Sequence, residues 1–87
     1  MKLLVMISPK GQDAELGVEI DRVMKAHYWN AIDGFDYTYA KDVENEDLND
    51  LKSGIADDVE AAFQEAEWSK VSYLYIIGGT QHTGKSK

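Results

Sequence analysis

The sequence contains no cysteine, and this absence removes several classes of protein at once. There can be no disulfide scaffold, no thiolate metal site and no cysteine nucleophile. No apolar run approaches the roughly 18–20 residues that a membrane-spanning helix needs. Residues 1–8 do not form a charged start with a cleavage site behind it, so no signal peptide is visible. We therefore expect a cytoplasmic protein that does not enter a membrane.

Basic residues are scarce. Nine Lys and Arg stand against 16 Asp and Glu, which gives a net charge of −7. A direct nucleic-acid binder must neutralise phosphates, so this balance argues against direct binding to nucleic acid. The acids are concentrated between Asp33 and Glu67, where only Lys41 and Lys52 oppose 12 of them. The sequence thus predicts a domain with one strongly acidic surface.

The length of 87 residues allows one domain. Apolar residues make up 44% of the sequence and aromatic residues 10%, as in ordinary globular proteins. Residues 80–87 contain no apolar side chain, and Lys85 and Lys87 make this end basic. We predict a single α/β domain over residues 1–79 and a flexible polar tail over residues 80–87.

Three segments have the pattern of strands. Lys2–Ile7 and Val71–Ile77 are apolar on both faces, which favours strands covered on both sides, as in a parallel sheet. In the segment 35–40, Phe35, Tyr37 and Tyr39 alternate with smaller or polar residues, which is typical of a half-buried strand.

Two segments have helical periodicity. Asp13 is a suitable N-cap for the first helix, which we expect to end between Asn30 and Gly34. The second is predicted over 55–67, with Ser53 and Gly54 interrupting its start. The expected core facing the sheet consists of apolar residues at helical spacing: Leu16, Ile20, Val23, Leu51, Ile55, Val59 and Phe63.

The order β-α-β-α-β favours an α/β fold with a three-stranded, mainly parallel sheet. We predict the strand order 2-1-3 with one helix on each face, because the first and third strands look doubly covered. The strands should place five residues in the core: Leu3, Val5, Ile7, Leu74 and Ile76. In this arrangement the loops after the first and third strands share the crevice where open α/β sheets bind ligands.

The segment Gly79–Ser86 fits the pattern G-x-x-x-x-G-K-[ST] and follows a predicted strand. Over these eight residues it resembles P-loop nucleotide hydrolases, which implies Lys85 on phosphates and Ser86 on Mg²⁺. That loop needs a following helix, and the sequence given stops one residue after Ser86. We therefore favour a flexible tail here.

The segment Ser8–Gly11, between a strand and a helix, resembles the phosphate-binding loop of flavodoxin-like flavin reductases in its layout. The next four residues differ from that family, because Asp13 and Glu15 would repel a phosphate. An alternative function is therefore phosphate or nucleotide binding in a flavodoxin-like or P-loop-like domain. Its site would consist of Ser8, Lys10, Gly11, Gly79, Gly84, Lys85 and Ser86.

Catalytic and metal-binding patterns are sparse. His27 lies on a helical stripe and is expected to pack, and His82 falls in the predicted tail. The acidic run 42–47 lacks the central glycine and the terminal glutamate of a Ca²⁺ loop. We expect no enzyme activity, no metal and no cofactor.

The second helix offers the most informative surface. Asp50, Asp57 and Glu60 cluster on its polar side, and Glu67 and Trp68 follow at its end, where Trp68 would be an exposed anchor. We predict that these five residues bind a partner protein.

The predicted protein is a small acidic inhibitor that blocks the basic, nucleic-acid-binding surface of a partner enzyme by mimicking nucleic acid. In size and charge it resembles small phage-encoded inhibitors, and the helix-then-strand layout of residues 59–77 is similar to that of barstar-like inhibitors. Two alternatives remain open besides phosphate binding: an assembly subunit that uses exposed strand edges, and acids that only solvate the surface.

Overall fold

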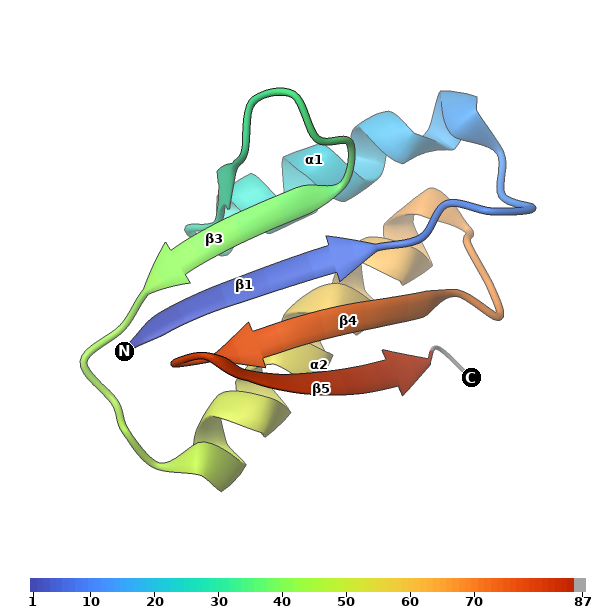
Figure 1. The fold of residues 1–87 in the computed structure, drawn as a ribbon. Coiled ribbons are helices and arrows are strands. Elements are labelled where there is room, and N and C mark those ends of the chain that lie inside the picture. The colour runs from blue at the N-terminus through green and yellow to red at the C-terminus, as the bar shows by residue number, and fades with distance from the viewer. Residues whose placement is uncertain (86–87) are drawn as a thin grey trace.

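Both helices lie on the same face of a single sheet (Figure 1), and the structure, a computed structural model, describes residues 1–85. The strands are β1 (Lys2–Ile7), β2 (Asn30–Ala31), β3 (Thr38–Asp42), β4 (Ser72–Ile77) and β5 (Thr80–Lys85). The helices are a 3-10 turn η1 (Ala14–Leu16), α1 (Gly17–Ala26) and α2 (Leu48–Ala66). Neither helix of this described part combines the length and hydropathy needed to cross a membrane.

The sheet is antiparallel throughout. Its strand order is β2-β3-β1-β4-β5, and β1 in the centre pairs antiparallel with both β3 and β4. The prediction of a three-stranded, mainly parallel sheet with one helix on each face was therefore wrong. Residues 1–85 form five strands and two helices on one side of the sheet, and no element of this part of the chain covers the second sheet face.

An apolar open face explains this error. In β1, Leu3, Val5 and Ile7 are buried beneath the helices, whereas Met6 on the opposite face is 41% exposed. An antiparallel sheet can leave one face toward solvent. The two-sided apolar pattern of β1 therefore reflects an unusually apolar open face and not a second layer of helix.

The same effect shifts the core of β4 by one residue. Tyr73 and Ile77 are buried on the helix side, while Leu74 and Ile76, predicted for the core, are half-buried on the open face. Because strand side chains alternate between faces, a shift of one residue exchanges the two sets.

Residues 80–85 form the edge strand β5, where a flexible tail was expected. Gly78 and Gly79 have φ of 58° and 102°, and Ile77 pairs with Thr80 across them. Positive φ at both central residues is the requirement of a two-residue type I′ hairpin turn, and glycine meets it without strain. Residues 86–87 lie outside the described part of the chain.

Asp13, predicted as the N-cap of the first helix, caps the 3-10 turn η1, while α1 itself begins after Leu16 without a side-chain cap. Asp13 Oδ1 accepts a hydrogen bond from the Glu15 amide at 2.9 Å, and the 3-10 turn leads directly into α1. The helix ends at Ala26, earlier than predicted, because Tyr28 takes a left-handed conformation with φ 69° and β2 then pairs with β3.

The second helix is longer than predicted and has no interruption at Ser53 and Gly54. It begins after Asp47, whose side chain accepts a hydrogen bond from the Asp50 amide at 3.1 Å. Its buried stripe contains the four predicted core residues Leu51, Ile55, Val59 and Phe63, together with Ala62 and Ala66. This stripe packs α2 firmly against the sheet and α1, so the opposite side of the helix faces solvent.

Candidate functional site

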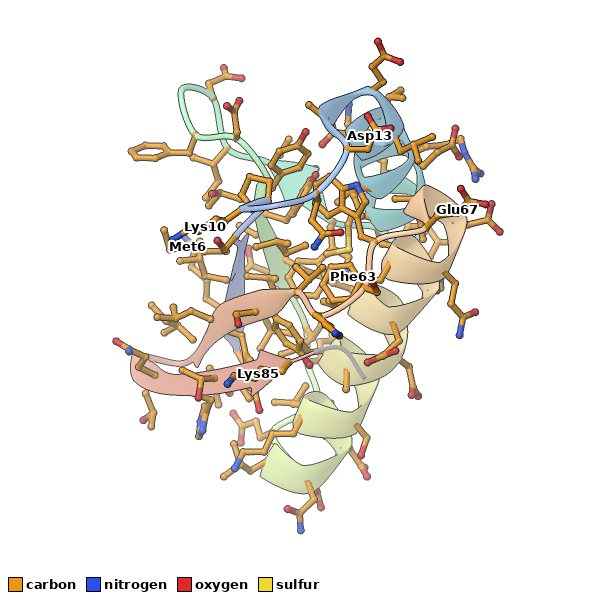
Figure 2. All side chains as sticks on the ribbon, turned by 90° about the vertical axis from the view of Figure 1, so that its right-hand side faces the viewer. Met6, Lys10, Asp13, Phe63, Glu67 and Lys85 are labelled. Carbon is orange, nitrogen blue, oxygen red and sulfur yellow. The ribbon has the colours of Figure 1, made fainter. Side chains whose placement is uncertain are left out.

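Four carboxylates predicted to bind a partner lie along the solvent side and the C-terminal end of α2. We call Asp50, Asp57, Glu60 and Glu67 the outer carboxylates. Three are exposed, and Glu60 is half-buried. At a rise of about 1.5 Å per residue they extend over about 26 Å of helix. Glu67 is the left-handed C-cap of α2, with φ 56°, and lies at the far end of the helix in Figure 2.

The outer carboxylates have no ion-pair partner within residues 1–85. In this part of the chain, Arg22 pairs with Glu19 and Glu65 at 2.7 and 3.2 Å. The remaining ion pairs join Asp58 to His27 and Lys41. Arg22, His27 and Lys41 are therefore paired with other acids, and the outer carboxylates direct unpaired negative charge toward solvent.

Asp58 is a hydrogen-bonding centre that the sequence did not reveal. Its carboxylate accepts from Trp29 Nε1 at 2.9 Å, lies 2.9 Å from His27 Nδ1 and lies 3.8 Å from Lys41 Nζ. Lys41 also donates to the His27 carbonyl at 2.9 Å and stands 5.5 Å from the centre of the Trp29 ring. The cluster ties α2 to the end of α1 and to β3. One signal could have indicated it: Asp58 precedes the buried Val59 and so borders the buried stripe.

A second acid is paired on α1. Asp21 accepts a hydrogen bond from the Tyr39 hydroxyl, and the Tyr39 side chain is fully buried. Burial, followed by the hydrogen bond to Asp21, raises the pKa of Tyr39 far above its ordinary value. Tyr39 therefore stays protonated and continues to donate over the whole neutral range.

Trp68 is not an exposed anchor. It is 4% exposed, and its Nε1 donates to the Asp13 carbonyl at 3.0 Å. Its ring meets that of Tyr37 edge to face, with 5.1 Å between the centroids. The left-handed Glu67 turns the chain back so that the Trp68 amide reaches the Phe63 carbonyl at 3.0 Å. Trp68 therefore connects the end of α2 to Asp13, the residue before η1. The prediction that Trp68 is exposed was wrong.

The residues predicted to bind phosphate are split between separate places. Gly79 forms the β4–β5 turn, whereas Gly84 and Lys85 lie at the opposite end of β5. Residues 80–85 are extended and paired with β4, so this backbone does not curl around a phosphate as a P-loop would. Lys10 and Gly11 are exposed in the loop after β1, and Ser86 lies outside the described residues.

Ser8 and Lys85 do come together. Both line a cavity of about 830 Å³ on the open face, at the end of β1 and β5. The lining residues come from three strands and the residue after β1: Met6, Ile7, Ser8, Ser72, Tyr73, Leu74, Thr83, Gly84 and Lys85. Antiparallel pairing creates this meeting, because it brings the end of β5 beside the start of β4 and the end of β1.

The two histidines are held by different neighbours. His27, expected to pack, has a side chain that is 44% exposed and bound to Asp58. His82 stacks on Tyr75 with 5.1 Å between the ring centroids, and its Nε2 is buried without a hydrogen-bond partner among the described residues. Within residues 1–85 no three His, Asp or Glu side chains gather as they would around a metal ion.

Comparison with known proteins gives no relative: no family model, curated protein or solved structure matches this chain.

Proposed function

We propose that this protein is a binding domain that presents the outer carboxylates of α2 to a basic surface of another protein. The observation that supports the proposal is the lack of any ion-pair partner for Asp50, Asp57, Glu60 and Glu67 within residues 1–85. Acids along the border with α1 and β3 have such partners, so the distribution of the few bases leaves one side of α2 negative.

The structure of α2 suits this role. Six buried residues hold the helix against the core, so the carboxylates are positioned before a partner arrives and little ordering entropy is lost on binding. A net charge of −7 would also steer a basic partner and raise the association rate. Trp68 has no part in this surface, because it is buried.

The specific form that we propose is inhibition of a nucleic-acid-binding enzyme, with carboxylates taking the place of phosphates in a basic groove. A phage-encoded inhibitor that acts in the cytoplasm would be one such protein. A row of carboxylates on a rigid helix supports this form, because a groove that binds phosphates selects for spaced negative charge.

The test compares two variants that carry the same change in net charge. The first neutralises α2 with Asp50→Asn, Asp57→Asn and Glu60→Gln. The second is the matched control, Glu15→Gln, Asp33→Asn and Glu44→Gln, which changes three exposed acids outside α2. Basic proteins from a host lysate that bind the immobilised chain are identified and purified. Their association rates are then measured at about 50 and about 500 mM salt, where the screening lengths differ about threefold.

We expect the α2 variant to lower the association rate at least tenfold at low salt, while the control variant changes it less than threefold. Duplex DNA should compete with the chain for the partner. A partner that binds both variants equally, with no dependence on salt, would exclude the outer carboxylates as the binding surface.

A further inference from the structure

The open face of the sheet carries its side chains in ordered rows across the strands. In antiparallel pairing, directly opposite residues point to the same face. Met6 pairs with Leu74, which pairs with Thr83. One step beyond, the Ser8 amide donates to the Ser72 carbonyl at 3.0 Å, and Ser72 pairs with Lys85. We call Ser8, Ser72 and Lys85 the polar row.

The rows on the other side of Met6 are apolar at their centre. Leu4 pairs with Ile76, and both are half-buried on the open face. Along β1 from Ser8, the open face therefore presents the hydroxyls and ammonium of the polar row first, then Met6, and then Leu4. The distance from the polar row to the Leu4 row is four residues, about 14 Å at a rise of about 3.4 Å per residue.

The cavity lies where the polar and apolar rows meet. Its volume of about 830 Å³ falls in the range of small-molecule sites. Met6 and Leu74 supply apolar surface to it, and the polar row supplies the two serines and Lys85 at its other side. The cavity is therefore amphipathic along the direction of the strands.

Charge favours an anion at the polar row. Of the described residues, the cavity lining contains Lys85 and no acid, although the chain as a whole carries −7. Lys85 has no ion-pair partner within residues 1–85. Figure 2 shows Met6, Lys10 and Lys85 on the sheet side of the molecule, with Asp13 and Glu67 on the helix side. Glu67, the outer carboxylate labelled there, thus lies away from the polar row.

We propose that this cavity binds a free alkyl carboxylate, with the carboxylate group on the polar row and the alkyl chain over Met6 and Leu74 toward Leu4 and Ile76. The positive charge and the hydroxyl donors complement the carboxylate. Removal of the alkyl chain and of the apolar side chains beneath it from water provides the main driving force. This site is independent of the binding role proposed for α2.

The probes are decanoate, decanol and decyltrimethylammonium, which share an alkyl chain and differ in charge. Each is added to the full chain below its micelle-forming concentration, and amide resonances are followed by NMR. Decanoate should shift the amides of the cavity lining and leave those of α1 and α2 in place. Decanol should bind more weakly at the same residues, and decyltrimethylammonium should bind most weakly.

Three variants assign the two ends of the site. Lys85→Gln should weaken decanoate binding at least tenfold and leave decanol binding unchanged. Leu74→Thr should weaken the binding of both probes, and Met6→Thr, at a 41% exposed position, replaces it if Leu74→Thr does not fold. Lys2→Gln, at the opposite end of β1, is the control and should change neither decanoate binding nor decanol binding.

Four results would overturn the proposal. The first is equal binding of decanoate and decyltrimethylammonium, and the second is a set of decanoate-induced shifts centred on the helices. The third is binding of the protein to anionic phospholipid vesicles but not to free decanoate. The fourth is a concentration-dependent dimer that covers the open face and excludes the probes. The last result, seen by analytical ultracentrifugation, would assign the face to a second copy of the chain.

Discussion

Asp57 and Asp58 are neighbours in the sequence, yet their surroundings differ completely. Asp57 faces solvent on the outer side of α2 and has no ion-pair partner within residues 1–85, whereas the Asp58 side chain is 16% exposed and is bound by three side chains. One step along a helix turns a side chain by about 100°. Because of that rotation, Asp58 contacts side chains of the fold, whereas Asp57 is accessible to a partner protein.

The same contrast extends to the other acids. Asp21 accepts a hydrogen bond from the buried Tyr39 of β3, Asp58 accepts one from the buried Trp29, and Glu65 is paired with Arg22. Within residues 1–85 the outer carboxylates have no ion-pair partner. Exposed acids add little to stability and repel one another, so a change at a paired acid should affect folding and a change at an outer carboxylate should affect binding.

The largest effect should come from an acid placed where it has neither solvent nor a donor. Val59→Asp puts a carboxylate at a position of 0% exposure. We expect a loss of about 4 kcal/mol or more in the free energy of unfolding, which would unfold much of the protein at 25 °C. The control, Ser53→Asp on the exposed side of α2, should cost less than about 1 kcal/mol. A melting temperature unchanged by Val59→Asp, measured by circular dichroism, would contradict the packing of α2.

A smaller effect should separate the neighbouring pair of acids. Asp58→Ala leaves the Trp29 indole, His27 and Lys41 without their shared acceptor, and we expect it to cost about 2–3 kcal/mol. Asp57→Ala should change stability by no more than about 0.5 kcal/mol. Urea denaturation gives both values, and the Trp29 indole N–H resonance in NMR spectra reports the loss of the indole contact. Equal effects of the two substitutions would show that the Asp58 cluster contributes nothing specific.

The smallest effect concerns pH. Burial and the Asp21 hydrogen bond raise the pKa of Tyr39 in the folded state, so above about pH 10 the unfolded chain loses this proton while the folded chain keeps it. Stability from this group is complete below about pH 10 and falls as the pH rises further. Urea denaturation between about pH 9 and about pH 11 should show a steeper fall for the wild type than for Tyr39→Phe. Tyr28→Phe, at an 82% exposed side chain, is the control and should follow the wild type.

The sequence by itself determined the elements with strong local periodicity. The buried stripe of α2 and the N-cap Asp13 follow from helical spacing and from local hydrogen bonding, which act within a few residues. The exposed side of α2, with Asp50 and Asp57, could be predicted for the same reason. The Gly78-Gly79 pair also contained the signal for the β4–β5 hairpin, which the polar composition of β5 obscured.

Only the tertiary structure decided strand direction and the partners of individual side chains. The apolar pattern of β1 is the same whether its second face is covered by a helix or left open, because periodicity records polarity and not the identity of the neighbour. Trp68 is buried because the left-handed Glu67 turns it back toward Asp13, and Ser8 meets Lys85 because three antiparallel strands bring residues 8, 72 and 85 side by side. The Trp68–Asp13 and Ser8–Ser72 contacts join residues more than 50 positions apart, and no local pattern in the sequence specifies them.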